Sequence, residues 1–205
     1  MKRTLFTLAV LTAFVAATAA QQPPKKEAKP DPPKADVQKQ AKKDPPPPPP
    51  PPKPGAEQAN LAKFAGTWKM EGKMESGPLG PGGPMTGTET CRMFDGGFHL
   101  VCESSGTGPM GPMKGHAIMT YDSTAKQYRY FAVNSAMPDA EMSTGTKTAT
   151  GWRWTSKGNM GGKVIHSRFV ITEKSPTVHT YVWEMSEDGK KWMKAMEGTS
   201  TKTGS

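Results

Sequence analysis

The stretch TWKMEGKM, residues 67–74, alternates between apolar or small and charged side chains. Successive side chains of a β-strand point to opposite faces. Trp68, Met70 and Met74 therefore share one face of an extended strand, and the charged residues between them share the other. The stretch predicts a strand with one apolar face and one solvated face.

Alternation of this kind continues to the end of the chain. Nine further stretches show it, at 87–94, 98–104, 113–121, 127–134, 141–147, 151–155, 163–172, 177–186 and 191–199. Turn residues separate them, and the one helical candidate is a single turn at 58–64. Many neighbouring strands with short connections favour an all-β, antiparallel up-and-down barrel of about ten strands over residues 61–205, because closure removes exposed sheet edges. A β-sandwich is the alternative.

The chain has two cysteines, Cys91 and Cys102, on either side of Gly96-Gly97. In a hairpin centred on these glycines, opposed residue numbers sum to 193, so the two cysteines face each other. A four-residue loop makes them a non-hydrogen-bonded pair, which suits a disulfide better than the two-residue loop does. Their spacing fits neither a Cys-x-x-Cys redox motif nor a zinc knuckle, so we expect a structural disulfide.

The first sixty residues differ in composition from the rest. Residues 1–20 have a basic start, an apolar run and small residues at the end, which predicts a cleaved signal peptide; a retained membrane anchor is the alternative. Residues 21–60 are rich in Pro, Lys and acidic residues, which predicts a disordered linker with a stiff polyproline section. We interpret it as a spacer, with docking to a partner in the cell envelope as the alternative. The predicted location is periplasmic or extracellular.

The net charge of +9 does not point to nucleic acid. Acidic and basic residues are interleaved through residues 61–205, and nucleic-acid binding needs a concentrated basic face. No membrane span is expected after signal cleavage.

The segment 61–68, LAKFAGTW, resembles the opening of lipocalin-like (calycin) barrels, in which the tryptophan closes one end. Residues 87–92, Gly96-Gly97-Phe98, Tyr121-Asp122 and Tyr128 resemble a bacterial family known as domain of unknown function 1579. The resemblance covers about residues 57–202 and implies a calycin-like barrel without an established activity. It also implies a barrel-closing role for Trp68, over which a basic residue of the last strand, Lys194 or Lys202, packs.

Five residues are candidates for ligand binding: Arg92, Trp152, Trp154, Arg168 and Trp183. Trp152 and Trp154 share a strand face, as do Tyr181 and Trp183, and core packing is the alternative role of these aromatic residues. Arg92 is a candidate for a charged group in the interior or at its rim, with a solvated role as the alternative. Arg168 completes the set of residues expected to line the interior.

Signals for cofactors, metals and catalysis are weak. The four histidines show no metal-ligand spacing, although His166 or His179 remains an alternative single ligand. Met85, Met110 and Met113 suggest Cu(I) as a further alternative, since soft sulfur suits that ion. No catalytic motif occurs, so we expect no cofactor, no metal and no catalytic residue.

The sequence thus favours an exported barrel that binds a small apolar or aromatic molecule and is held on a proline-rich spacer. One alternative is a structural or envelope-interaction protein with a filled barrel and no ligand. A less favoured alternative is a weak hydrolase or isomerase.

Overall fold

The structure is a computed structural model that describes residues 46–204. The predicted signal peptide, residues 1–20, and most of the predicted linker, residues 21–60, lie outside the described residues. Within the described part, residues 46–55 have no regular secondary structure and are exposed. The compact unit Pro49–Ser205 holds the helix and all the strands described below.

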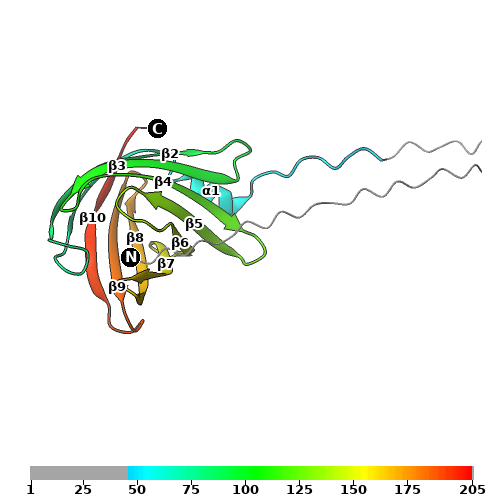
Figure 1. Cartoon of the computed structure of the whole chain (residues 1–205). Coiled ribbons are helices and arrows are strands. Elements are labelled where there is room, and N and C mark those ends of the chain that lie inside the picture. The colour runs from blue at the N-terminus through cyan, green and yellow to red at the C-terminus, as the bar shows by residue number, and fades with distance from the viewer. Residues whose placement is uncertain (1–45, 205) are drawn as a thin grey trace, which may run out of the picture. The chain divides into compact units, whose positions relative to one another are not determined.

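Ten antiparallel strands form one closed barrel, in which each strand pairs with its neighbours in sequence and β1 pairs with β10 (Figure 1). This confirms the predicted up-and-down barrel. The strands are β1 (Gly66–Met74), β2 (Gly83–Met93), β3 (His99–Gly108), β4 (Gly111–Asp122), β5 (Gln127–Asn134), β6 (Glu141–Thr148), β7 (Gly151–Met160), β8 (Lys163–Ser175), β9 (Val178–Ser186) and β10 (Met193–Gly204).

A short helix, α1 (Ala56–Ala62), precedes the first strand. It begins at Ala56, within the predicted linker 21–60 and five residues before the predicted start of the barrel domain at residue 61. The helix packs across the end of the barrel near β3 and β4. Leu61 is fully buried there, and Asn60 Nδ2 donates to the Tyr128 hydroxyl at 3.2 Å. Helix α1 therefore belongs to the folded domain and closes one end of it.

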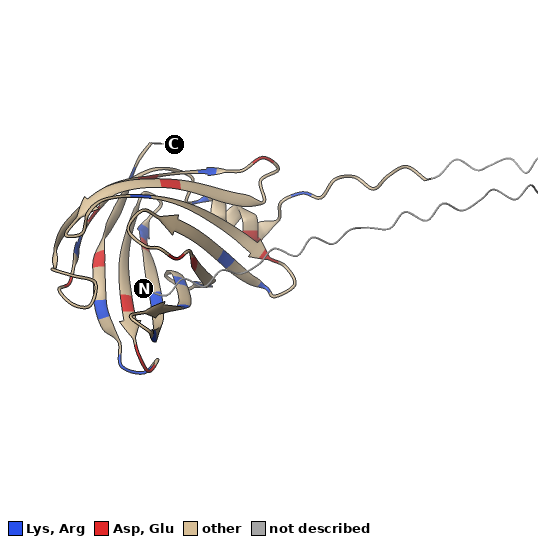
Figure 2. Cartoon of the chain, viewed as in Figure 1, with Lys and Arg blue, Asp and Glu red and all other residues tan. Residues whose placement is uncertain are grey.

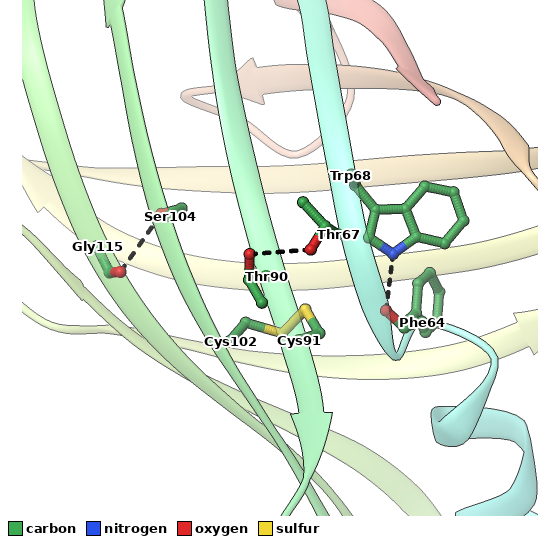
Figure 3. The surroundings of a disulfide bond; sticks show 8 residues. All are labelled: Phe64, Thr67, Trp68, Thr90, Cys91, Cys102, Ser104 and Gly115. Atoms are coloured by element: carbon green, nitrogen blue, oxygen red, sulfur yellow. Dashed lines mark hydrogen bonds between the residues drawn. A yellow bond between two sulfur atoms is a disulfide. The ribbon is translucent and has the colours of Figure 1, made fainter. Parts of the chain in front are cut away.

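The β2–β3 hairpin confirms the predicted disulfide. Cys91 lies opposite Cys102, and the two form a disulfide bond (Figure 3). Phe94 N donates to His99 O at 2.8 Å, so the loop has four residues and the cysteines form a non-hydrogen-bonded pair, as a bridge prefers. Both cysteines are buried among core residues, so their side chains face the barrel interior.

The barrel interior differs between its two ends. At the end covered by α1, the inward-facing side chains form a dense cluster that includes Leu61, Phe64, Trp68, Leu100 and Trp152, all buried. Trp68 Nε1 donates to Phe64 O at 2.8 Å, which ties the first strand to the chain segment that follows the helix (Figure 3). We call this half the closed end, and the other half the open half.

Charged residues of both signs are spread over the strands of the barrel (Figure 2). Several are paired: Lys73 bridges Glu75 and Glu197, and Arg129 bridges Asp122. Ion pairs of this exposed kind contribute little to stability, about 0–1 kcal/mol each.

Among the described residues, no helix has the length and apolar character needed to cross a membrane.

Candidate functional site

The open half of the barrel interior is the candidate site. Along β2, Cys91 is buried at the closed end, whereas the inward-facing residues Gly83, Met85, Gly87 and Glu89 are only half-buried. Most other strands also have half-buried inward residues in this half, at Met70, Gly72, Ser104, Gly106, Met113, Tyr130, Ser156, Ser167, Phe169, Trp183 and Met196. Five inward residues of the same half are buried: Met74, Gly115, Ala132, Ser143 and Met185. A packed interior leaves few voids and would bury these inward-facing side chains. Because they are partly exposed, this half of the lumen is accessible to solvent.

Stacked aromatic rings form the floor of the lumen. Trp152 is fully buried at the closed end, and its Nε1 donates to Glu173 Oε1 at 2.9 Å. Trp154 stacks on it toward the open half, with ring centroids 6.0 Å apart and planes 9° apart. Tyr130 lies beside Trp154, at 5.8 Å between centroids. A ligand that reached the floor would meet flat apolar surface.

Glycines let two aromatic side chains lie against the wall of the barrel. A Cβ at Gly145 would be 2.5 Å from the Trp154 ring, and a Cβ at Gly198 would be 2.4 Å from the Tyr181 hydroxyl. Tyr181 also stacks on Phe169, with centroids 5.6 Å apart. These rings therefore cover the wall instead of filling the centre of the lumen.

The Tyr181 hydroxyl is buried and has no hydrogen-bond partner among the described residues. Burial also raises the pKa of this phenol. Buried polar atoms in native proteins are nearly always paired, so an unpaired one calls for an explanation such as an absent ligand or water.

Glu89 is the acidic residue at the floor of the open half. Its cross-strand neighbours are Trp68 on β1 and Ser104 on β3. Its carboxylate lies within 4.8 Å of the sulfur atoms of Cys91 and Cys102. Burial raises the pKa of this carboxyl to about 7, because the apolar surroundings disfavour the charged form. No side chain described in the structure forms an ion pair with it.

A second carboxylate lies closer to the mouth. Glu141 accepts a hydrogen bond from Ser143 Oγ at 2.7 Å, and Ser143 is cross-strand to Tyr130. Burial, followed by the charges of Glu141 and Glu89, raises the pKa of Tyr130. Tyr130 therefore lies within electrostatic reach of both carboxylates.

The mouth of the lumen is lined by methionines, by other apolar side chains and by the ion pair of Lys163 with Glu187. A hollow of about 330 Å³ opens there, lined by residues that include Pro78, Met160, Ile165, Met185 and Met193. Methionine side chains adapt their shape to what they contact, so this entrance suits flat ligands of varied outline.

A larger hollow, about 630 Å³, lies outside the lumen. It is open and is lined by side chains of the outer wall, among them Lys69, Thr86, Thr88, Ser105 and Thr107. These side chains are polar and exposed, so the hollow lacks the apolar enclosure that is typical of ligand pockets.

The structure brings three of the five predicted ligand-binding residues into the interior. Trp152 is packed into the closed end, and Trp154 forms the floor of the open half. Trp183 is half-buried in the lumen wall, where its Nε1 donates to Ser167 Oγ. Each of these tryptophans is therefore a packing residue, and Trp154 and Trp183 also border the accessible lumen.

The two predicted arginines lie on the outer wall. Arg92 follows the inward-facing Cys91, so strand alternation turns it outward, where it is exposed. Arg168 pairs with Glu184 across β8 and β9, and its guanidinium lies 4.2 Å from the centroid of the Trp192 ring. Neither arginine lines the lumen in this structure.

Sequence reasoning missed Glu89, Tyr130 and Tyr181 as site residues. For Glu89 a signal existed, because it lies two residues before Cys91 and thus shares its face. This signal could not be used from sequence alone, because it was not known that the disulfide faces the interior. Tyr130 and Tyr181 belong to apolar rows that core packing explains equally well.

The cluster of Glu89 with the two cysteine sulfurs is not suited to metal binding. Glu89 and the two cysteine sulfurs lie together, but the sulfurs are bonded to each other and provide no thiolate. His166 lies outward on β8, whereas His179 is buried against Trp68, with ring centroids 4.5 Å apart. Burial lowers the pKa of His179.

The chain belongs to the family described as "Protein of unknown function (DUF1579)", whose model matches residues 53–202. This confirms the resemblance drawn from the sequence. The calycin-like closure is present as well: Lys202, not Lys194, lies over Trp68, with Nζ 5.6 Å from the ring centroid. No curated protein is significantly similar to the chain in sequence.

Several solved structures are similar to the chain at low sequence identity. The redesigned β-barrel mFAP0 bound to DFHBI is 17% identical over 68% of this chain and 99% of its own, with a TM-score of 0.40. A de novo designed fluorescence-activating β-barrel is 14% identical over 71% and 98%, with a TM-score of 0.39. The S-type phycobiliprotein lyase CPES from Guillardia theta is 10% identical over 73% and 93%, with a TM-score of 0.48. At these values the three structures indicate nothing about what this barrel binds.

Proposed function

We propose that this DUF1579 protein binds a small, ring-containing molecule in the open half of its barrel. The observation that carries the proposal is the contrast between the two halves of the interior. Most inward-facing residues are buried at the closed end, and most of their counterparts on the same strands are half-buried in the open half, with Met74, Gly115, Ala132, Ser143 and Met185 as buried exceptions. A filled, purely structural barrel would bury both sets.

The chemistry of the lining supports the same proposal. Ligand pockets are mostly apolar and aromatic, with a few polar groups that orient the ligand. Here the rings of Trp154, Tyr130 and Phe169 provide the apolar surface. Among the described residues, the Tyr181 hydroxyl has no hydrogen-bond partner and Glu89 forms no ion pair. A ligand that satisfied these groups would recover the free energy lost by desolvating them.

The proposal includes a location outside the cytoplasm. Disulfides persist in oxidising compartments, and the Cys91–Cys102 bond is consistent with export. The predicted signal peptide and proline-rich spacer belong to the same proposal. N-terminal sequencing of the protein from its source organism would test this part, because an uncleaved N-terminus in the cytoplasm would contradict it.

The binding proposal is tested with a substitution that fills part of the lumen and with a matched substitution on the outer wall. Ser104 faces the lumen and is half-buried, whereas its neighbour Ser105 is exposed on the outer wall. We expect Ser104→Trp to lower the affinity for small ring compounds at least tenfold, and Ser105→Trp to leave it unchanged. Isothermal titration calorimetry with a panel of neutral, cationic and anionic indoles measures both.

Folding of the two variants is checked by near-ultraviolet circular dichroism. If no member of the panel binds the wild-type protein, or if the two tryptophan variants bind equally well while both are folded, the lumen is not a ligand site. The filled structural barrel would then be the better description.

A further inference from the structure

We infer that the molecule bound in the lumen is a protonated amine with a flat apolar body, held by Glu89 and, nearer the mouth, by Glu141. This inference rests on the proposed lumen site and names the class of its ligand. It follows from the sign of the charge inside the barrel, from the isolation of Glu89, and from the rings around both carboxylates.

The charge of the lumen is opposite in sign to that of the whole chain. The chain carries a net charge of +9. In the open half, strand alternation and register turn Glu89 and Glu141 inward. Among the described residues they also turn Lys163 inward at the mouth, where its ammonium group pairs with Glu187 at 3.0 Å, so this pair adds no net charge. Two further basic side chains, Lys147 and Lys202, lie at the closed end beside α1 and Trp68.

A cation is the partner that Glu89 lacks. A desolvated carboxylate is costly unless a cation or hydrogen-bond donor faces it. The hydroxyl of its neighbour Ser104 donates to Gly115 O instead, at 3.5 Å (Figure 3). Glu89 is half-buried, and no side chain among the described residues forms an ion pair with it. Burial raises its pKa accordingly. An ammonium group at this position would provide both charge and donors.

The surrounding rings suit the same class of ligand. Ammonium groups are attracted to the faces of tryptophan and tyrosine rings. Tyr130 lies within reach of both carboxylates and is packed beside Trp154. An amine near Glu89 would therefore have π faces close by, and an aromatic body would extend along the floor toward the methionine-lined mouth.

Three indoles of similar size separate the charge classes. Tryptamine is cationic, tryptophol is neutral, and indole-3-acetate is anionic at neutral pH. We expect tryptamine to bind at least tenfold more tightly than tryptophol at pH 8, and indole-3-acetate to bind most weakly. Isothermal titration calorimetry at pH 5.5, 7 and 8.5 gives the affinities.

The pH series tests whether Glu89 is the group responsible. Below pH 7 Glu89 takes up a proton and loses its charge, so the advantage of tryptamine over tryptophol should shrink about tenfold per pH unit. The other titratable groups that face this region are Tyr130, Glu141, Tyr181, His179 and Lys202, with Lys163 and Glu187 at the mouth. His179 and Lys202 lie on the far side of Trp68, and the tryptophol titration measures any effect they have on the lumen itself.

Glu89→Gln keeps the shape of the side chain and removes its charge. Glu103→Gln is the matched control, because Glu103 is exposed on the outer wall of β3. We expect Glu89→Gln to abolish the preference for tryptamine and its pH dependence, Glu141→Gln to weaken the preference by a smaller factor, and Glu103→Gln to change neither. The wild-type pH series provides a readout that depends on no variant.

The outcomes distinguish this inference from the proposed function. If tryptophol or indole-3-acetate binds as tightly as tryptamine at pH 8.5, and Ser104→Trp still blocks binding, the lumen is a ligand site but not an amine site. The inference is also overturned if Glu89→Gln is folded and keeps the full preference. If none of the indoles binds, the proposed function and this inference are both overturned.

Discussion

Lys202, near the end of the last strand, lies over the ring of Trp68 in the first strand, with Nζ 5.6 Å from the ring centroid. The backbone fits this contact closely, because a Cβ at Gly66 would be 2.4 Å from Lys202 Cε. Trp68 and Lys202 are cross-strand partners in the β1–β10 pairing that closes the barrel. The contact therefore joins the two ends of the sheet at the closed end.

Removing this tryptophan should destabilise the fold strongly. Trp68 is 3% exposed and packs against His179 and Phe64. We expect Trp68→Ala to lower the free energy of unfolding by about 3–5 kcal/mol, and Lys202→Met to lower it by about 0.5–1 kcal/mol. Urea titration followed by circular dichroism measures both.

Lys69 provides the control, since it is the next residue along β1 and points outward into an exposed ion pair with Glu71. Lys69→Met should change the free energy of unfolding by less than about 1 kcal/mol. A Trp68→Ala variant no less stable than Lys69→Met would show that Trp68 does not close the barrel.

The disulfide should stabilise the hairpin that forms part of the lumen floor. Replacing both cysteines by serine removes the cross-link that closes the β2–β3 loop, and we expect a loss of about 3 kcal/mol in the free energy of unfolding. Dithiothreitol should shift the wild-type urea midpoint toward that of the double variant and leave the variant itself unchanged. Equal midpoints of oxidised and reduced wild-type protein would contradict this expectation.

The isolated carboxyl of Glu89 predicts an unusual dependence of stability on pH. The native state keeps the proton up to about pH 7, whereas the unfolded chain loses it near pH 4.5. Between these values the native state binds more protons, so stability falls as the pH rises. The shift corresponds to a loss of up to about 3 kcal/mol by pH 8.

Glu89→Gln should remove this loss. We expect the variant and the wild-type protein to have similar urea midpoints at pH 5, and the variant to be the more stable protein at pH 8. Glu103→Gln, on the outer wall, serves as the control. Parallel pH profiles of Glu89→Gln and wild type would show that water or a cation already solvates the Glu89 carboxylate.

The barrel was predictable from the sequence because alternation and turn residues are local signals. Strand β5 was predicted with its observed bounds, 127–134. The register of the β2–β3 hairpin followed from its turn and its two cysteines. Both features depend on residues close together in the chain, so no knowledge of the closed barrel was needed.

The candidate site was less predictable, because alternation does not tell which face of a strand points inward. Cys91 and Arg92 could be assigned to the interior equally well until the barrel closed, and the structure places Cys91 inside. On β4 to β6 the outer face is also apolar, since Ile118, Phe131 and Met142 are 45%, 44% and 73% exposed. Glu89 on β2 and Glu141 on β6 both lie within electrostatic reach of Tyr130. These strands are far apart in sequence, and only the closed barrel brings the three residues together.

Gly145 keeps the floor of the lumen flat, and its replacement should affect both stability and binding. A Cβ at this position would be 2.5 Å from two carbon atoms of the Trp154 ring, which is rigid and packed against Trp152. Gly145→Ala should therefore force Trp154 toward the centre of the lumen, at a cost of about 1–3 kcal/mol in the free energy of unfolding. The same shift should reduce the affinity for tryptamine and change the tryptophan fluorescence.

Gly158, on β7, is the matched control, because a Cβ there would meet no atom within 4 Å. Gly158→Ala should leave stability unchanged or raise it by about 0.4–1 kcal/mol, since alanine restricts the unfolded chain. If Gly145→Ala is as stable as Gly158→Ala and binds tryptamine equally well, Trp154 has room to move without narrowing the lumen. The packing of the Trp154 ring against Gly145 would then not be needed to keep the lumen open.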